Sequence, residues 1–490
     1  MAGGSLGDVS TDPMKPDAPR SSVPMTVKVI DGAVAGAAAA ALALFIFGPF
    51  RAVAGDTPLS IRWTHLLFAA IALAIVRHAA YHSPNSAATW RSWFADVAER
   101  PALADALLAF LLTRPVVLLI GFLAVATFGL VAGAPASSPR TILRELPARF
   151  DANWYAGIAA EGYEWQGRFD RQQNFAFFPA FPMTMKAVGV VTGAYADGIS
   201  RERRITRFTW AGLLVALVSF VGAAWYFSSI ARDFLPPERA GMAVLLIAAY
   251  PFALFFSAAY TESLFLLTTL GAWFHFRRHQ LVRAALLGLV AGLTRPNGCF
   301  LSVPLGLIAI GLADVPQTHT PPPAKSTPSV FSRLVVAAMP GVGMLIYTTY
   351  LYFGTGVWFA WARVQVAWGR VLSGNSASSS AHLSGGLLQF AADHPYTALN
   401  AMGLAFATAL IWPVWRRLGP AWTAYVLVNV GPPLISGGML SMGRMSSTLF
   451  PLFLALAAVL PSRVWPAIAV AFGLMQGFLA ALFYTWRDLY

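Results

Sequence analysis

The stretch RFDANWYAGIAAEGY, residues 149–163, places an aspartate and several aromatic residues shortly after an apolar segment of membrane length. Within it, Phe150, Trp154 and Ile158 recur at every fourth position, a spacing that gives a helix one apolar face. The pattern predicts an amphipathic helix that lies along a membrane surface, with Asp151 at its N-terminal edge. Shortly afterwards, NFAFFPAFP (residues 174–182) opens another apolar segment with two prolines.

The composition of the whole chain is that of an integral membrane protein. Of the 490 residues, 57% are hydrophobic and 11% are charged, and the mean hydropathy is +0.61; soluble globular domains are less apolar and more charged. The formal net charge of +13 comes mostly from arginines in short clusters between apolar segments. That distribution is typical of loops that anchor a membrane protein on its cytoplasmic side, so we predict no nucleic-acid partner. The single cysteine, Cys299, excludes an internal disulfide.

The predicted fold class is all-α, a polytopic membrane protein with about 13 transmembrane helices, because one crossing needs roughly 20 apolar residues. An additional apolar piece at 240–258 is interrupted by Tyr250-Pro251 and is predicted to be bent or re-entrant. Residues 87–112 are predicted to form an amphipathic helix on the inner surface. The predicted spans are 31–50, 62–79, 116–133, 177–195, 208–229, 262–276, 283–296, 298–312, 333–353, 396–417, 421–439, 446–461 and 464–484.

Three arginine-rich segments determine the predicted orientation. RERRITR at 201–207, FRRHQLVR at 276–283 and WRR at 415–417 are all expected in the cytoplasm. An odd number of crossings cannot join two segments on one side, so the piece at 240–258 is predicted to stay in the outer half. The resulting alternation puts 134–176 on the outer face.

The predicted domain organisation has three parts. Residues 1–28 are rich in Gly, Ser, Pro and Asp and are expected to be a disordered cytoplasmic tail. Residues 29–115 hold two N-terminal spans and the inner-surface amphipathic helix. Residues 116–490 form the main membrane domain, whose large external loop, 134–176, carries Asp151.

Two acidic residues at the ends of apolar segments are candidates for chemistry on the outer face. Asp151 can act as a base at the boundary between water and hydrocarbon, or it can be only the N-cap of an interfacial helix; the spacing leaves both open. Glu262 stands at the start of an apolar segment. An acid so close to hydrocarbon is costly unless it is used or paired, although first-turn acids also stabilise helices.

Three arginines and a glutamine are expected on the same face. Arg295 and Arg444 each interrupt an apolar stretch, and WARVQVAWGR adds Gln365 and Arg370. Several arginines that converge with acids suggest a site for an anionic head group, because guanidinium binds phosphate bidentately. Each arginine alone is also explained as a boundary residue, and the last segment as an amphipathic surface helix.

Four segments together resemble a known family. RFDANWYAGIAAEGY, NFAFFPAFP, AAYTESLFLL (258–267) and GLTRPNG (292–298) are similar to the bacterial relatives of the second GPI mannosyltransferase, the PIG-V type, within the class C membrane glycosyltransferases. The segments around Gln365 and Arg444 look similar but are less specific. Phe150 stands where that family usually has Trp, and two additional spans precede the usual first one. Because two is an even number, the outward placement of the large loop is preserved.

The resemblance implies a mannosyltransferase in the bacterial plasma membrane. It would transfer a sugar, mannose in the first place, from a polyprenyl-phosphate donor to an acceptor hydroxyl on the outer face, with inversion. In such an enzyme Asp151 is the general base. Arg295, Arg370 and Arg444 then stabilise the departing lipid phosphate.

The same resemblance suggests further substrate-binding residues. Trp154 and Tyr163 would stack on sugar rings or hold the lipid, Gln365 would contact substrate, and Glu262 would orient the acceptor or a bound cation. No cofactor is predicted beyond this divalent cation, which is left open, and the acceptor can be a glycolipid, a protein or a polysaccharide. The alternative function is a transporter or flippase for a lipid-linked sugar. Such proteins usually carry repeated halves and ionisable residues near the bilayer midplane, and neither is visible here.

Overall fold

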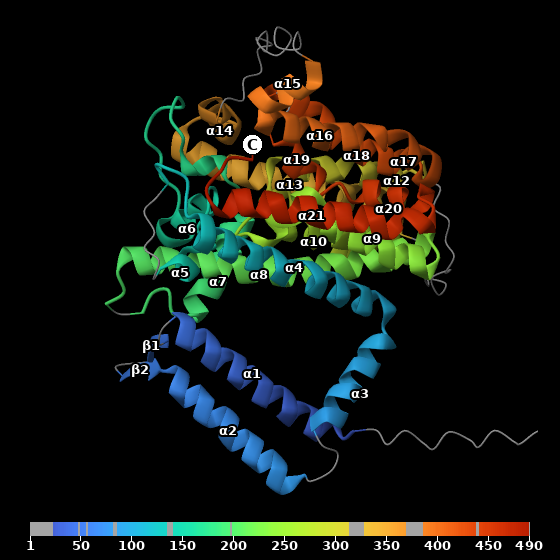
Figure 1. Ribbon diagram of the computed structural model, residues 1–490. Coiled ribbons are helices and arrows are strands. Elements are labelled where there is room, and N and C mark those ends of the chain that lie inside the picture. The colour runs from blue at the N-terminus through green and yellow to red at the C-terminus, as the bar shows by residue number, and fades with distance from the viewer. Residues whose placement is uncertain are drawn as a thin grey trace, which may run out of the picture. The chain divides into compact units, whose positions relative to one another are not determined.

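The computed structural model describes residues 23–47, 50–54, 57–81, 86–134, 141–196, 198–312, 328–368, 386–437 and 441–489. In these ranges the protein is helical apart from one two-stranded sheet, β1 (Phe50–Ala54) and β2 (Thr57–Ile61) (Figure 1). The predicted all-α fold class is confirmed except for this hairpin. Residues 1–22 of the predicted tail lie outside the described ranges, and the first helix begins at Met25.

The chain divides into two compact units. The first comprises residues 1–49 and 61–99, and the second comprises 50–60 and 100–490. The first unit contains α1 (Met25–Phe47), α2 (Trp63–Ala80) and α3 (Ser86–Ala98). A buried ion pair joins its first two helices, because Arg77 Nε lies 2.9 Å from Asp31 Oδ1.

The amphipathic helix predicted over 87–112 is wrong as a single element. α3 ends at Ala98, and a new helix, α4, runs from Pro101 to Phe128. A proline at the first position starts a helix readily, because its missing N–H needs no partner there. Residues 101–112 therefore belong to a 28-residue apolar helix and not to an element on the inner surface. The boundary between the two units likewise falls before Arg100.

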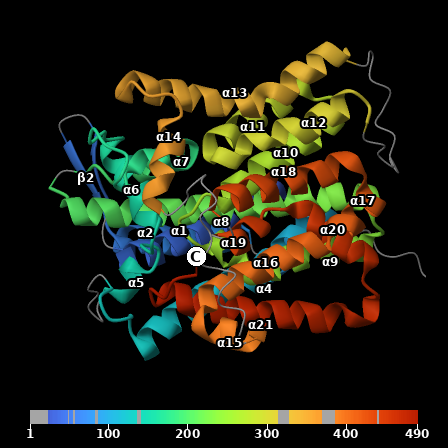
Figure 2. The same ribbon diagram turned by 90° about the horizontal axis from the view of Figure 1, so that it is seen from above.

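The second unit is a bundle of helices that largely follows the predicted spans. Figure 2 shows α13 along one side of this unit and α21 along the other, with α8 and α10 between them. The elements are α5 (Ile142–Glu145), α6 (Ala152–Glu161), η1 (Asn174–Ala176), α7 (Ala180–Val191), α8 (Arg201–Phe234), α9 (Pro237–Ala249), η2 (Pro251–Ser257), α10 (Glu262–Arg277), α11 (Leu281–Thr294), η3 (Pro296–Leu301), α12 (Ser302–Ala309), α13 (Val330–Thr355), α14 (Ala360–Arg363), η4 (Val364–Trp368), α15 (Gly386–Asp393), α16 (Pro395–Ala409), α17 (Ile411–Leu418), α18 (Pro420–Gly437), α19 (Met442–Ser446), α20 (Phe450–Val459), η6 (Ser462–Val464) and α21 (Trp465–Tyr484).

Among the described residues, six helical segments are long and apolar enough to cross a membrane. They are α2, α4, α8, α13, the pair α16 and α17, and η6 with α21. The bent pair α9 and η2 is a seventh if it counts as one span, and four further apolar helices are shorter. The chain is thus suited to a multi-pass membrane protein, while the number of about 13 crossings stays a prediction.

The prediction that RERRITR faces the same side as FRRHQLVR is wrong. This segment forms the start of α8, where Arg201 Nε lies 2.5 Å from Glu161 Oε1 at the end of α6. FRRHQLVR lies at the other end of α8, where Arg277 Nη1 is 3.0 Å from Asp233 Oδ2. The two basic segments therefore occupy opposite ends of one helix, and RERRITR shares its end with α6.

RERRITR was assigned to the wrong side because the segment 177–195 was predicted to cross the membrane. α7 covers most of this predicted span. α7 has 12 residues, about 18 Å of helix, which is too short to cross about 30 Å of hydrocarbon. Phe177 ahead of it stacks on Trp154 of α6, with ring centroids 5.8 Å apart. Tyr195 after it donates a hydrogen bond from its hydroxyl to Ala160 O of α6 at 3.0 Å. Both ends of α7 thus contact α6, so the chain does not change sides here.

The predicted bend at Tyr250-Pro251 is confirmed, since α9 and η2 meet there at 78°. The bent piece does not remain at one end of the bundle, however. α9 begins near the Asp233 end of α8, where Gly241 packs against Asp105 and Asp105 pairs with Arg232 at 2.6 Å. η2 then leads to α10, which starts beside α6. Three elements, α8, the bent pair and α10, therefore connect the two basic segments, and their odd number agrees with opposite ends.

A buried arginine on α4 stabilises this bend. The bend interrupts the helical hydrogen bonds, and carbonyl groups freed in this way need other partners. Arg114 Nη2 donates to Ala248 O at 2.6 Å, and Gln476 Nε2 of α21 donates to Ala248 O at 2.9 Å and to Tyr250 O at 2.8 Å. Arg114 also lies over the ring of Phe220, with its guanidinium 4.8 Å from the centroid. The bend is therefore a built feature, and it leads directly into the residues before α10.

Candidate active site

Asp151 immediately precedes α6, but its side chain does not cap the helix. The structure shows no hydrogen bond from an α6 amide to its carboxylate. Instead Asp151 Oδ2 accepts a hydrogen bond from Arg444 Nη1 at 2.7 Å. The capping interpretation is therefore not supported, and the carboxylate is available to a site.

Four charged side chains form a continuous chain of ion pairs, which we call the ion-pair chain: Asp151, Arg444, Glu262 and Arg295. Arg444 Nε donates to Glu262 Oε1, and Arg295 Nη1 donates to the same oxygen at 2.7 Å. The Glu262 side chain is fully buried, whereas that of Asp151 is 17% exposed. Buried charges are tolerated when they are paired and hydrogen-bonded. Two guanidinium groups here neutralise two carboxylates, and the exposed end of the chain is the Asp151 carboxylate.

Tyr260, at the end of the segment that follows the bend, contacts both Asp151 and Arg444 of the ion-pair chain. Its hydroxyl accepts a hydrogen bond from the Asp151 backbone N–H at 3.1 Å. Its ring lies under Arg444, whose guanidinium is 4.6 Å from the centroid, a favourable contact for a cation and an aromatic face. The bend of α9 and η2 therefore positions Tyr260 and Glu262 together, and through them Asp151.

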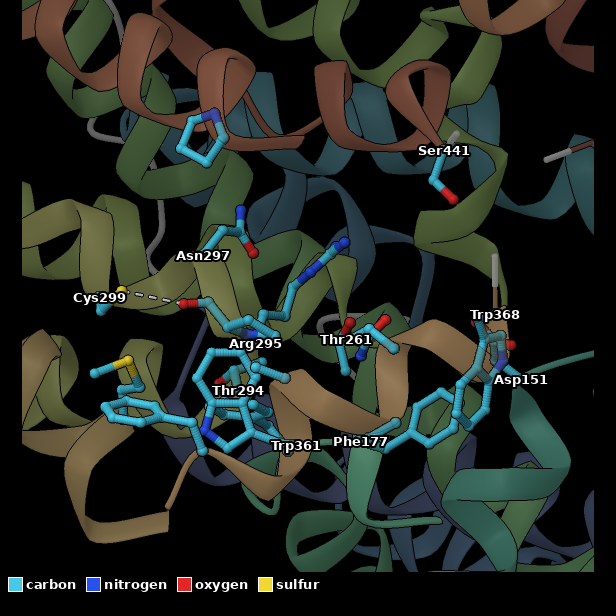
Figure 3. Close-up of a pocket in the computed structure, with 18 of the residues that line it drawn as sticks. Asp151, Phe177, Thr261, Thr294, Arg295, Asn297, Cys299, Trp361, Trp368 and Ser441 are labelled. Atoms are coloured by element: carbon cyan, nitrogen blue, oxygen red, sulfur yellow. Dashed lines mark hydrogen bonds between the residues drawn. The ribbon is translucent and has the colours of Figure 1, made fainter. Parts of the chain in front are cut away.

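A cavity of about 1370 Å³ lies over the ion-pair chain. Figure 3 shows Asp151 and Trp368 at one end and Asn297 and Cys299 at the other, with Arg295 between. The residues that line it are Asp151, Tyr155, Gln172, Ala176, Phe177, Phe178, Thr261, Thr294, Arg295, Pro296, Asn297, Cys299, Phe300, Met344, Trp358, Phe359, Trp361, Ala362, Arg363, Gln365, Val366, Ala367, Trp368, Pro432, Ser441, Arg444 and Met445. Within this lining, Asp151 is the one acidic side chain.

Tyr155 also lines this cavity, but its hydroxyl cannot act as a base. Tyr155 is buried in α6, and burial raises its pKa to about 12, because desolvation disfavours the charged phenolate. The hydroxyl therefore stays protonated at neutral pH. Among the described residues, no group of three or more His, Cys, Asp or Glu side chains is placed to hold a metal ion.

The structure brings most of the predicted site residues together. Asp151, Arg295, Gln365 and Arg444 line the cavity, and Glu262 lies directly behind it in the ion-pair chain. Arg370 lies outside the described residues.

Trp154 and Tyr163, both predicted to bind substrate, pack behind the residues that line the cavity. Trp154 packs on Phe177 and Trp368, at centroid distances of 5.8 and 6.0 Å. The Tyr163 hydroxyl donates to Phe177 O at 2.8 Å, and its ring packs on Tyr347 at 5.5 Å. Neither residue is among those that line the cavity.

The predicted apolar face of α6 is also different. Phe150 precedes the helix, has a positive φ of 46° and packs on Phe483 with centroids 5.5 Å apart. The buried face is made by Ala152, Tyr155, Ala156, Ile158 and Ala159. The three alanines among them let α6 lie close to α7 and α8, so this helix is part of the protein core and not a free interfacial element.

Sequence reasoning missed several residues of the site, above all Arg363, Thr261, Asn297 and Trp361, which line the cavity. Arg363 lies in the segment WARVQVAWGR, in which Gln365 and Arg370 are the predicted site residues. Thr261 and Asn297 are next to predicted residues in the same short segments. Their position beside Glu262 and Arg295 was the signal that could have found them.

Residues 136–310 match the model of the family described as mannosyltransferase (PIG-V). Over this segment the chain is similar to the PIG-V-type family. Asp151, Glu262 and Arg295 lie inside the matched segment, and Arg444 joins them from outside it. The expected family resemblance is thus confirmed for the part of the chain that carries both acids.

Two curated relatives of this chain are GPI alpha-1,6-mannosyltransferase 2 of Rattus norvegicus and of Mus musculus. Each is 30% identical over 151 residues, which is 31% of this chain and 29% of the relative. The match thus spans less than a third of either relative. Among solved structures, the Archaeoglobus fulgidus oligosaccharyltransferase tethered with an acceptor peptide is similar with a TM-score of 0.39 and 12% identity, over 81% of this chain and 56% of that chain.

Proposed function

We propose that this protein is a mannosyltransferase of the class C type, which transfers mannose from a polyprenyl-phosphate donor to an acceptor hydroxyl with inversion. The observation that carries the proposal is the ion-pair chain, whose exposed end is a carboxylate in a large cavity. The family match of residues 136–310 supports the reaction class, and the activity for which the two mammalian relatives are named supports mannose as the sugar. The acceptor is a glycolipid, protein or polysaccharide that carries a free hydroxyl.

In this proposal Asp151 is the general base. The acceptor oxygen attacks the anomeric carbon, the bond from that carbon to the phosphate oxygen breaks, and the acceptor proton passes to the Asp151 carboxylate. Asp151 is suited to this role because it is the one acidic side chain in the cavity lining. A positioned base of this kind contributes about 10²- to 10⁴-fold in rate.

The arginines have different roles in this scheme. Arg444 contacts both Asp151 and Glu262, so its charge is already matched, and we assign it to holding the base in place. Arg295 has one carboxylate partner and lines the cavity, so we assign it to the negative charge that develops on the departing phosphate. Glu262 does not line the cavity, and we assign it to holding both guanidinium groups in position.

The size of the cavity supports a donor with a lipid and a second substrate. Sites for single small molecules usually enclose about 300–1,000 Å³. The volume of about 1370 Å³ found here gives room for a sugar phosphate, the first part of its lipid and the acceptor hydroxyl. We place this cavity on the outer face of a bacterial plasma membrane, because FRRHQLVR and WRR remain at the end of the bundle away from α6 (Figure 1).

The test compares Asp151→Asn with Asp170→Asn. Asp170 is an exposed carboxylate in the same loop, paired with Arg168, and serves as the matched control. Purified protein in lipid nanodiscs is given polyprenyl-phosphate mannose and a membrane extract as acceptor, and release of polyprenyl phosphate is followed over time. We expect a rate loss of about 10²- to 10⁴-fold for Asp151→Asn and none for Asp170→Asn. A wild-type rate in the first variant would overturn the role of Asp151.

The same purified protein, placed in proteoliposomes, distinguishes a flippase from a transferase. Wild-type protein that moves a lipid-linked sugar across proteoliposomes without releasing polyprenyl phosphate would contradict the transferase proposal. If polyprenyl phosphate is released, mass spectrometry of glycolipids and glycoproteins from a deletion strain identifies the acceptor of the transferase.

A further inference from the structure

Arg363 at the end of α14 differs from the other arginines of the cavity. It lines the cavity and is exposed. Among the described residues no carboxylate lies within salt-bridge distance of it, and its guanidinium is 5.9 Å from the ring centroid of Phe169. Arg295 and Arg444, in contrast, are both engaged by Glu262. Arg363 is therefore the cavity cation that can take an anion without first breaking an ion pair.

The segment that carries Arg363 is held firmly. Trp361 Nε1 donates to Thr348 Oγ1 of α13 at 2.9 Å, and its ring packs on Phe178 with centroids 5.3 Å apart. Val364, next to Arg363, is fully buried. Because these contacts fix the backbone on both sides of Arg363, only its side chain has to become ordered when it binds a ligand.

Large apolar side chains are exposed around this cation. Trp358, Phe359 and Val366 all line the cavity and are 52%, 42% and 55% exposed. Phe353, at the end of α13, is 83% exposed. A lipid chain that lies against these side chains buries apolar surface on both partners, which is favourable. A cation flanked by exposed hydrocarbon matches a ligand with the same two parts, a phosphate and a lipid chain.

We propose that Arg363, with the exposed side chains of Trp358, Phe359 and Val366, binds the phosphate and the first isoprenyl units of the lipid-linked donor before reaction. Arg363, the cation of this lipid-phosphate subsite, lines the same cavity as Arg295 but is not part of the ion-pair chain. Guanidinium binds phosphate through two parallel hydrogen bonds, while the three apolar side chains bury the adjoining hydrocarbon. The inference rests on the proposed function, because that function supplies the lipid-linked donor.

The experiment measures binding without catalysis. Radiolabelled polyprenyl phosphate that carries no sugar is equilibrated with the full-length protein in nanodiscs, and the dissociation constant is determined. We expect Arg363→Gln to weaken binding about tenfold or more, because a hydrogen-bonded charge pair is lost, and Arg363→Lys to restore part of the loss. Arg168→Gln is the matched control, since Arg168 is also exposed but does not line the cavity, and we expect no change.

Competition separates a lipid phosphate from a free one. Full-length polyprenyl phosphate should displace the radiolabel from wild-type protein, whereas inorganic phosphate and a short-chain prenyl phosphate should do so only at far higher concentration. Trp358→Ser should weaken binding of the full-length lipid and reduce its advantage over the short-chain compound. Equal displacement by inorganic phosphate would overturn the lipid part of the subsite.

The inference and the proposed function fail in different ways. Binding that is unchanged in Arg363→Gln would overturn the lipid-phosphate subsite even if the protein transfers mannose. Failure of the wild-type protein to turn over any lipid-linked donor would overturn the proposed function, even if binding of polyprenyl phosphate depends on Arg363.

Discussion

Arg444 Nη1 lies 2.7 Å from Asp151 Oδ2, while Nε of the same side chain contacts Glu262. One guanidinium group thus connects the exposed acid of the cavity with an acid that is fully buried. The two acids come from distant segments of the chain, and the arginine comes from a third. The position of the proposed base therefore depends on a residue that lies outside the part of the chain matched by the family.

The first prediction concerns Arg444→Lys. Lysine keeps the positive charge, but its single ammonium group cannot replace a guanidinium that serves two carboxylates from separate nitrogens. A base displaced by about 1 Å can cost about 100-fold in rate, so we expect kcat to fall by about this factor. Initial rates of polyprenyl phosphate release measure it. Arg239→Lys is a control, because Arg239 uses one nitrogen for Ala457 O and its neighbours; a wild-type kcat in Arg444→Lys would contradict the prediction.

The second prediction concerns Glu262→Gln. The variant removes the negative charge that two buried guanidinium groups share. Loss of one partner of a buried ion pair typically destabilises a protein by about 3–5 kcal/mol, so the thermal unfolding midpoint in detergent should fall clearly. Glu161→Gln removes an exposed acid paired with Arg201, and surface pairs of this kind contribute little. Equal midpoints for the two variants would show that the buried pairs do not stabilise the fold.

The third prediction concerns the packing of α11 against α13. A Cβ atom on Gly292 would lie 1.9 Å from Pro340 O, and a backbone carbonyl in a helix cannot move aside easily. Small residues allow such close helix contacts in membrane proteins. We expect Gly292→Ala to lower the unfolding midpoint and to displace the adjoining Arg295. Gly306→Ala on α12, where a Cβ meets nothing within 4 Å, should leave both unchanged, and two indistinguishable variants would refute the close packing.

The fourth prediction uses Cys299, the one cysteine of the 490 residues. Because Cys299 lines the cavity, its labelling reports the side on which the cavity opens. A membrane-impermeant maleimide should label it in intact cells if the cavity faces outward, and excess polyprenyl phosphate should protect it. Cells opened by mild detergent provide the total. Labelling that occurs only after opening would place the cavity on the cytoplasmic side.

The long apolar helices could be predicted closely from the sequence. α10 (Glu262–Arg277) was expected at 262–276, and α13 (Val330–Thr355) at 333–353. Continuous apolar stretches with charged ends carry this information locally. RERRITR misled the prediction, because the tendency of arginines to remain inside is statistical. Here Arg201 is paired with Glu161, a contact between segments that no local pattern reveals.

The site was predicted in part for a similar reason. Asp151, Glu262, Arg295 and Arg444 were selected because a charge next to hydrocarbon needs an explanation. Their order along one chain of ion pairs depends on tertiary structure and could not be read from spacing. The sequence predicts a ligand contact for Tyr163, whereas its ring packs on Tyr347 behind the cavity lining, because a sequence does not distinguish a ring that faces a cavity from one that packs behind its wall.

The length of α8 has a consequence for the acceptor. Its 34 residues make a helix of about 51 Å, whereas the hydrocarbon of a bilayer is about 30 Å thick. An upright α8 therefore projects about 20 Å into the headgroup layers and the water beyond. Its arginine-rich first turns make up part of this projection, and Glu161 ties the end of α6 to them. We expect an acceptor to reach Asp151 from the layer of lipid headgroups. A water-soluble polypeptide or polysaccharide acceptor would then be modified without entering the bilayer hydrocarbon.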